Sequence, residues 1–423
     1  MQVMMMEPIK ITGAGIVSAI GNNMAETLLA LQKGETGVGQ LKYLNTSHRE
    51  FPVGEVKMSN EEMKQVLGIG SEPCTRTSLM GMFAMREALD KASLAVPLTE
   101  NVALISGTTV GGMDKSEQYY LDYLNSDSRN DYIKTHDCGA TTELIARYFG
   151  AFSMTTSIST ACSSAANAII LGANLIRSGL TDIVVAGGCE CITKFHLNGF
   201  NSLMILDHQK CKPFDASRAG LNLGEGAAWL VLESSASAQR RGVKALGELS
   251  GFGNACDAFH QTASSDDGEG AYLAMEKALA MAGLTPTDID YVNAHGTGTF
   301  NNDLSESQAL FRVFGQGIPP VSSTKGFTGH TTSASGSVEA VICLLALQEG
   351  FCPVNYGWQT PMEHGILPVI QKDVSSLQVT AYSLRGDSPV SSKQSAVSEI
   401  KHVMCNSFGF GGNDSCLILS KTY

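Results

Sequence analysis

The sequence predicts an α/β protein in which helices pack on the faces of sheets. Three observations lead to this prediction. Strand-like apolar runs alternate with helical stretches along the 423 residues. Hydrophobic residues make up 43% of the chain and charged residues 17%, which allows a large buried core. The same succession of units occurs twice, so we expect two similar halves, residues 1–250 and 251–423.

The first half is expected to begin with a strand that runs into a glycine turn. Buried strands are predicted wherever β-branched and small apolar residues end at glycines, and helices wherever apolar residues recur at helical spacing. The polar, tyrosine-rich stretch 115–135 is predicted to leave the main layers. The predicted strands are 9–21, 101–112, 181–188 and 227–234, and the predicted helices are 76–92 and 142–150.

The second half repeats this organisation and ends with two strands around a glycine-rich turn. Its helices are marked by apolar periodicity that stops at glycine. Residues 385–397 are rich in serine and are predicted to form an exposed loop. The predicted strands are 245–253, the start of 288–299 and the pair within 401–420, and the predicted helices are 270–284 and 337–350.

Composition excludes several classes of function. The formal net charge of −12 argues against general nucleic-acid binding. The 11 cysteines are scattered and no secretory signal is recognisable, so we expect free thiols in a cytoplasmic protein without a membrane span. The stretch "GAGIVS" is better explained by a tight turn than by a dinucleotide site. We predict no cofactor and no metal.

Cys162 stands where a short β-branched run, "ISTA", meets the helical composition of "SSAANAII". A thiol at the start of a helix is exposed to the positive end of the helix dipole and to unpaired N–H groups, which favour the nucleophilic thiolate. A buried structural cysteine is an equally good explanation of this position alone.

His295 comes directly after a strand-like run in "NAHGTGT", and Lys325 and His330 lie five residues apart in "STKGFTGH". Each of the three has an ordinary structural explanation when taken alone. Together with Cys162 they indicate catalysis. A cysteine protease needs only one histidine, whereas two neutral imidazoles can donate hydrogen bonds to a thioester oxygen that gains charge. The set therefore favours carbanion chemistry beside a thioester.

The motifs "TACSSAANAI", "VNAHGTGT", "STKGFTGH", "GEGAAWLVLE" and "CNSFGFGGND" resemble those of the β-ketoacyl-acyl carrier protein synthases. The N-terminal "ITGAGIVSAIGNN" extends the resemblance over essentially the whole chain. It is closer to the elongating synthases than to the initiating ones, which use Cys-His-Asn. The resemblance implies a thiolase-like fold of two pseudo-repeated halves in an α-β-α-β-α arrangement. It also implies decarboxylative condensation of an acyl group with malonyl-acyl carrier protein, in fatty-acid, polyene or polyketide biosynthesis.

The resemblance assigns a role to each matching residue. Cys162 carries the acyl group, and its N–H forms the oxyanion hole with that of Phe410. His295 and His330 bind the malonyl thioester, and Lys325 pairs with Glu306, beside Asp303. Thr297 and Thr299 bind the pantetheine arm. The residues expected at the gate and the acyl pocket are Phe410, Gly409, Gly411, Phe200 and Val110.

The implied partners are an acyl carrier protein, with acyl and malonyl groups on its phosphopantetheine, and a second subunit, identical or related. Two alternatives stay open: an inactive chain-length-factor subunit and a degradative thiolase acting on coenzyme A thioesters. Departures at "YIKTHDCGATTELIARYFG", Leu221 and "GGND" suggest a specialised synthase, such as one of the aryl-polyene pathways.

Overall fold

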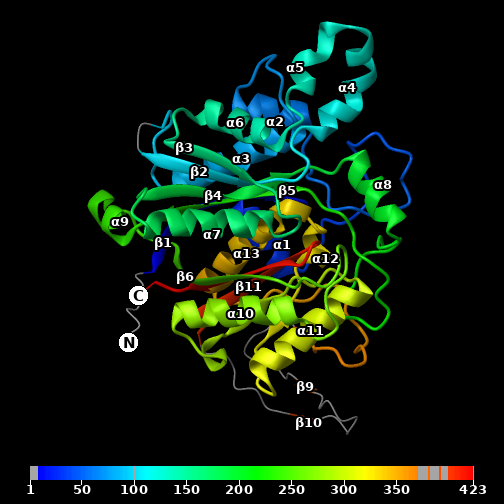
Figure 1. Cartoon of the computed structure of the whole chain (residues 1–423), viewed down its shortest axis with the longest axis vertical. Coiled ribbons are helices and arrows are strands. Elements are labelled where there is room, and N and C mark those ends of the chain that lie inside the picture. Colours follow the sequence, from blue (N-terminus) through cyan, green and yellow to red (C-terminus); the bar gives the residue numbers. More distant parts are fainter. Residues whose placement is uncertain (1–7, 99–100, 370–379, 382–389, 392–398, 423) are drawn as a thin grey trace.

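A computed structural model of the chain describes residues 8–98, 101–369, 380–381, 390–391 and 399–422. Ten strands form one continuous hydrogen-bonded sheet, and helices cover both faces of each half of it (Figure 1). The predicted α/β class is confirmed. Among the helices of the described residues, none is both long and apolar enough to cross a membrane.

The first half supplies five strands in the order β3-β2-β4-β5-β1. β2 pairs in parallel with β3 and β4, and β5 pairs antiparallel with β4 and β1. The strands are β1 (Ile9–Ser18), β2 (Val102–Gly107), β3 (Met154–Ile158), β4 (Ile183–Glu190) and β5 (Gly226–Glu233).

The second half repeats this topology in the order β8-β7-β11-β12-β6. β7 is parallel to β8 and β11, and β12 is antiparallel to β11 and β6. A short pairing of β1 with β6 joins the halves. The strands are β6 (Gly247–Cys256), β7 (Tyr291–Asn293), β8 (Val321–Ser322), β11 (His402–Gly409) and β12 (Asn413–Ser420).

Helices make three layers around the two half-sheets, which gives the expected five-layer arrangement (Figure 1). The middle layer contains α7 (Ser164–Arg177) and α13 (Ser335–Glu349), which contact strands of both halves, with α1 (Met24–Lys33) beside α13. The outer layers contain α2 (Asn60–Leu67), α3 (Arg76–Lys91) and α6 (Cys138–Phe149) on one side and α10 (Glu269–Ala282) and α11 (Phe300–Phe314) on the other.

Equivalent glycines let the first strand of each half lie directly against a helix. A Cβ added to Gly15 on β1 would come within 2.1 Å of the Ala84 carbonyl oxygen on α3. A Cβ added to Gly253 on β6 would come within 2.1 Å of the Ala274 carbonyl oxygen on α10. Both distances are far below van der Waals contact, so each strand–helix interface depends on the missing side chain.

The expected excursion near residues 115–135 consists of α4 (Met113–Asn125), a 3-10 turn (Asp127–Arg129) and α5 (Asn130–Ile133), which project from the body (Figure 1). The remaining helices are α8 (Lys194–Ser202), α9 (Ser235–Arg241) and α12 (Lys325–Thr328), with 3-10 turns at Pro286–Asp288 and Thr332–Ala334.

Two short strands, β9 (Thr380–Ala381) and β10 (Val390–Ser391), pair with each other. The predicted loop 385–397 lies outside the described residues apart from β10. The division at residue 250 stays a prediction.

Candidate active site

Cys162 lies on a tight elbow between β3, which ends at Ile158, and α7, which begins at Ser164. Ala161 has a φ of 50°, a left-handed conformation that costs energy for a residue with a Cβ. The Thr160 N–H donates to the Ser164 hydroxyl, and that hydroxyl donates to the Ala161 carbonyl. These bonds hold the strained turn and aim the thiol away from the helix.

The Cys162 thiol is buried, and burial raises its pKa to about 11. The Lys325 ammonium and the Phe410 N–H both act to lower this pKa, but burial has the larger effect. The expectation that the helix start makes the thiol more acidic overall is therefore wrong. A thiol in this state needs a neighbouring base to become a nucleophile.

His330 is that neighbour. Its Nε2 lies 3.1 Å from Cys162 Sγ, and its Nδ1 lies 2.9 Å from the Ser335 hydroxyl at the start of α13. The backbone N–H of His330 donates to the Asn222 carbonyl at 2.7 Å, which fixes the loop that carries the ring. Burial and the Lys325 charge hold the pKa of His330 well below its usual value, so the ring is neutral and can accept the thiol proton.

His295 lies just beyond β7 and is held by a buried carboxylate. The backbone N–H groups of His295 and Gly296 donate to the two oxygens of Glu306, at 2.8 and 2.7 Å. The ring of His295 lies 5.2 Å from that of His330, nearly perpendicular to it. Burial, with Lys325 and His330, holds the pKa of His295 well below its usual value, so both imidazoles are neutral.

The expected pair of Lys325 with Glu306 is wrong. Lys325 Nζ lies 2.5 Å from Glu339 Oε1 on α13, whereas Glu306 is occupied by backbone N–H groups. Asp303 instead accepts hydrogen bonds from the N–H groups of Phe214 and Gly298. Sequence reasoning missed Glu339, although a carboxylate near the start of the apolar stretch 337–350 was an available signal, because buried charges need partners.

Lys325 Nζ also lies 3.3 Å from His295 Nδ1. An ammonium can only donate, so Nδ1 is the accepting nitrogen of the neutral ring and Nε2 carries the hydrogen. His295 therefore presents an N–H donor to the pocket. Cys162, His295 and His330 each offer one ligand atom, and these atoms lie within 4.8 Å of one another.

The turn Gly409–Gly412 between β11 and β12 lies over Cys162. The Phe410 N–H is directed at the Cys162 sulfur, and the Phe410 ring stacks on that of Phe200 with centroids 6.0 Å apart. Sequence reasoning missed Asn413, whose side-chain oxygen accepts from Ser163 Oγ at 2.8 Å and from Asn167 Nδ2 at 2.7 Å. Asn413 thus ties this turn to the elbow that carries the thiol.

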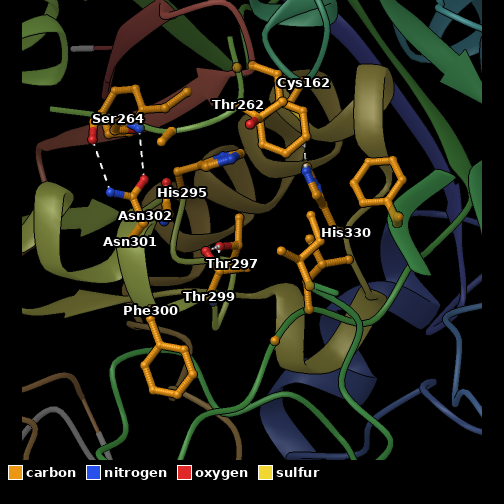
Figure 2. Close-up of a pocket in the computed structure, with 18 of the residues that line it drawn as sticks. Cys162, Thr262, Ser264, His295, Thr297, Thr299, Phe300, Asn301, Asn302 and His330 are labelled. Carbon is orange, nitrogen blue, oxygen red and sulfur yellow. Dashed lines mark hydrogen bonds between the residues drawn. The ribbon is translucent and has the colours of Figure 1, made fainter. Parts of the chain in front are cut away.

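A pocket of about 980 Å³, including its opening to solvent, is lined by Cys162, His295 and His330 (Figure 2). Thr297 and Thr299 line it, with their hydroxyl oxygens 2.9 Å apart. The other expected residues that line it are Phe200, Leu221, Gly409, Phe410 and Gly411. Val110 is buried outside this pocket, where its N–H faces Glu190.

Models of two families match the chain: the beta-ketoacyl synthase N-terminal domain over residues 6–238 and the beta-ketoacyl synthase C-terminal domain over residues 246–359. Among curated proteins, the chain is 30% identical to the 3-oxoacyl-[acyl-carrier-protein] synthase 2 of Staphylococcus aureus, with 97% of each chain covered. It is also 30% identical to the enzyme of that name from Vibrio harveyi, over 97% of this chain and 98% of the relative.

Solved structures show the same fold. The ishigamide ketosynthase/chain length factor is 27% identical and superimposes with a TM-score of 0.85, over 99% of this chain and 100% of that one. The ketosynthase ApeO in complex with its chain length factor ApeC, from Xenorhabdus doucetiae, is 30% identical with a TM-score of 0.80, over 98% of each chain.

Proposed function

Because the chain belongs to the beta-ketoacyl synthase family, we propose that it is a condensing acyltransferase that joins an acyl group on Cys162 to malonyl-acyl carrier protein. The observation that carries this proposal is the arrangement of one thiol, one accepting imidazole and one donating imidazole around a single pocket. The product is a 3-oxoacyl-acyl carrier protein, and carbon dioxide is released.

In the first half-reaction Cys162 takes the acyl group. His330 Nε2 accepts the thiol proton over 3.1 Å, and the thiolate attacks the thioester carbonyl. The backbone N–H groups of Cys162 and Phe410 stabilise the oxyanion. The carrier's pantetheine sulfur leaves and takes the proton from His330, which returns the ring to its neutral form.

In the second half-reaction the malonyl thioester occupies the same pocket. The Nε2–H of His295 donates to its thioester oxygen, and negative charge gathers on that oxygen as the C–C bond to carbon dioxide breaks. Ser335 can donate to or accept from His330 Nδ1, so the His330 ring can also present an N–H. The enolate carbon attacks the acyl thioester, and the Cys162 thiolate leaves and takes up a proton.

The pantetheine arm of the carrier protein is proposed to run along Thr297 and Thr299, with Phe410 as the gate toward Phe200. Val110, which lies outside the pocket, is proposed to limit the acyl chain beyond this gate. Both similar solved structures named above are ketosynthase and chain-length-factor proteins. We therefore propose that the chain works as a dimer, with a second copy or with a related subunit.

The arrangement around Cys162 distinguishes the two alternatives. An inactive partner subunit has no need of a thiol 3.1 Å from an imidazole. A degradative thiolase needs a second cysteine at the reacting atoms, but Cys162 is the single cysteine among the described residues that line the pocket. All 11 cysteines are free thiols, which supports a reducing, cytoplasmic location.

The proposal is tested by intact-mass spectrometry with octanoyl- and malonyl-acyl carrier protein. The wild-type chain and Cys256→Ala, which removes an exposed thiol, are expected to gain one acyl group and to form 3-oxoacyl product. Cys162→Ala is expected to do neither. Acylation or product formation by Cys162→Ala contradicts the proposal.

Chain specificity is tested with a panel of saturated and polyunsaturated acyl carrier proteins. The departures within 132–150 and at Leu221 lead us to propose polyunsaturated chains as the better substrates. Equal turnover of ordinary saturated chains contradicts the assignment to a polyene pathway and leaves the condensing activity in place.

A further inference from the structure

Two aspartates support the Gly409–Gly412 turn from beneath. The N–H of Asp257, at the end of β6, donates to the Gly412 carbonyl at 2.8 Å. The N–H of Gly409 donates to the carboxyl of Asp414, on β12. Both aspartates pack against Gly270 at the start of α10, where an added Cβ would lie 2.1 Å from Asp414 Oδ2 and 2.9 Å from Asp257 Cβ. The two side chains therefore occupy one crowded site.

Three carboxyl groups lie at this site without a cationic partner among the described residues. Asp257, Asp414 and Glu306 lie around one small gap in the packing, together with Phe408. The nearby cations are engaged elsewhere, since Arg218 pairs with Asp303 and Arg312 with Asp267 and Glu269. Within the described part of the chain, no lysine, arginine or histidine forms an ion pair with the three carboxyl groups.

The hydrogen-bond pattern indicates which group carries a proton. Asp257 Oδ2 accepts from the Ser265 N–H, but its buried Oδ1 has no partner. Asp414 is 4% exposed, and burial together with the charges of Asp257 and Glu306 raises its pKa to about 8. A protonated Asp414 can accept from Gly409 and donate its own O–H toward Asp257, whereas a charged Asp414 would repel it.

We propose that Asp414 is a positioning residue that acts in its protonated form, holding the Gly409–Gly412 turn so that the Phe410 N–H stays directed at Cys162. Loss of that proton places two like charges at Gly270. Because the Asp257 backbone holds Gly412 and the Asp414 carboxyl holds Gly409, their repulsion loosens both ends of the turn. The inference rests on the proposed function, in which the Phe410 N–H belongs to the oxyanion hole.

The first test is the pH profile of Cys162 acylation between pH 6 and 10, measured by intact mass. The wild-type rate is expected to fall about tenfold per pH unit above a break near pH 8, although ionisation of the thiol alone would raise it. Asp414→Asn, which keeps the shape and stays neutral, is expected to lose this break and keep the rate measured at pH 7. Asp266→Asn is the matched control, because Asp266 is exposed and lies in the loop between β6 and α10 that also contains Asp257.

The second test needs no catalysis and compares thermal unfolding at pH 5 and pH 8. A carboxyl whose pKa is raised by folding stabilises the protein at low pH, and that stability is lost as pH rises toward the raised value. Asp414→Asn is therefore expected to have a smaller drop in melting temperature than the wild type and Asp266→Asn.

An acylation break that persists in Asp414→Asn, or equal melting shifts in all three proteins, overturns the inference. Absence of any acyl-enzyme in the wild type at every pH would overturn the proposed function instead, and the melting comparison would still decide whether Asp414 holds a proton.

Discussion

The two halves of the molecule share one topology but differ in the loops at the ends of their strands. In the first half, the residue two positions after β2 is Thr109, whose N–H donates to the buried Glu190. In the second half, the residue two positions after β7 is His295, whose N–H donates to the buried Glu306. In both halves a backbone N–H bound by a buried carboxylate therefore fixes the loop, and in the second half that loop carries the pocket residue His295.

The two loops differ in whether the buried carboxylate also binds the side chains of the loop. Glu190 also accepts the hydroxyls of Thr108 and Thr109, so the side chains of that loop are used for its own structure. Glu306 binds only backbone at its loop, so the His295 side chain can point into the pocket. The first half thus contributes the thiol, and the second half contributes the imidazoles proposed to move protons and hold charge.

The largest expected effect on activity comes from replacing one of these two loop residues, His295. His295→Ala removes the N–H that stabilises the enolate, so condensation is expected to fall by about 10²–10³-fold. Acylation of Cys162 is expected to continue, because His330 and the Phe410 N–H remain. Thr109→Val is the matched change in the first half and is expected to cost about 1 kcal/mol of stability, with a condensing rate within a few-fold of wild type.

We would measure malonyl decarboxylation and acyl-enzyme mass separately for each variant. These two measurements distinguish the effect of His295→Ala from that of Thr109→Val. If His295→Ala lost both half-reactions equally, the division of labour between the two histidines would be wrong. A Thr109→Val variant as inactive as His295→Ala would remove the distinction between the halves.

The next largest effect concerns one buried cation from each half, Arg76 and Lys325. Arg76 binds Glu225 at 2.6 Å and donates to the Met58 and Val56 carbonyls, so Arg76→Met is expected to lose about 3–5 kcal/mol of unfolding free energy. Lys325→Met leaves Glu339 buried, but burial already raises the pKa of this carboxyl to about 7, so it can take up a proton.

The two variants should therefore differ in their dependence on pH. Lys325 lowers the pKa of the buried Glu339 carboxyl, so its removal raises that pKa further. A carboxyl whose pKa is raised by folding loses stability as pH rises, so Lys325→Met is expected to be less stable at pH 8 than at pH 6. It should also lose condensing activity, because His295 Nδ1 loses its donor. Urea unfolding at the two pH values checks the contrast, and a Lys325→Met variant without pH dependence speaks against it.

The groups proposed to be catalytic could be singled out from the sequence because each stands in a short motif. The repeated halves could be predicted as well, because strand and helix periods are local properties. The partner of Lys325 could not, since Glu339 approaches it only when α12 and α13 fold together. The raised pKa of Cys162 was also out of reach, because it follows from burial of the thiol in the folded protein, which outweighs the Lys325 charge and the Phe410 N–H.

The smallest effect tests whether the halves are equivalent in packing. Gly15→Ala and Gly253→Ala each place a methyl group 2.1 Å from a helix carbonyl oxygen, so each is expected to lose about 1–3 kcal/mol of unfolding free energy. Gly199→Ala, on α8 with open space around it, is the control and should be neutral or slightly stabilising. Because the two contacts match, equal losses of unfolding free energy in urea would show that the two halves have the same strand–helix packing, although their loops differ. A loss confined to one half would mean that the repeated topology does not carry a repeated interface.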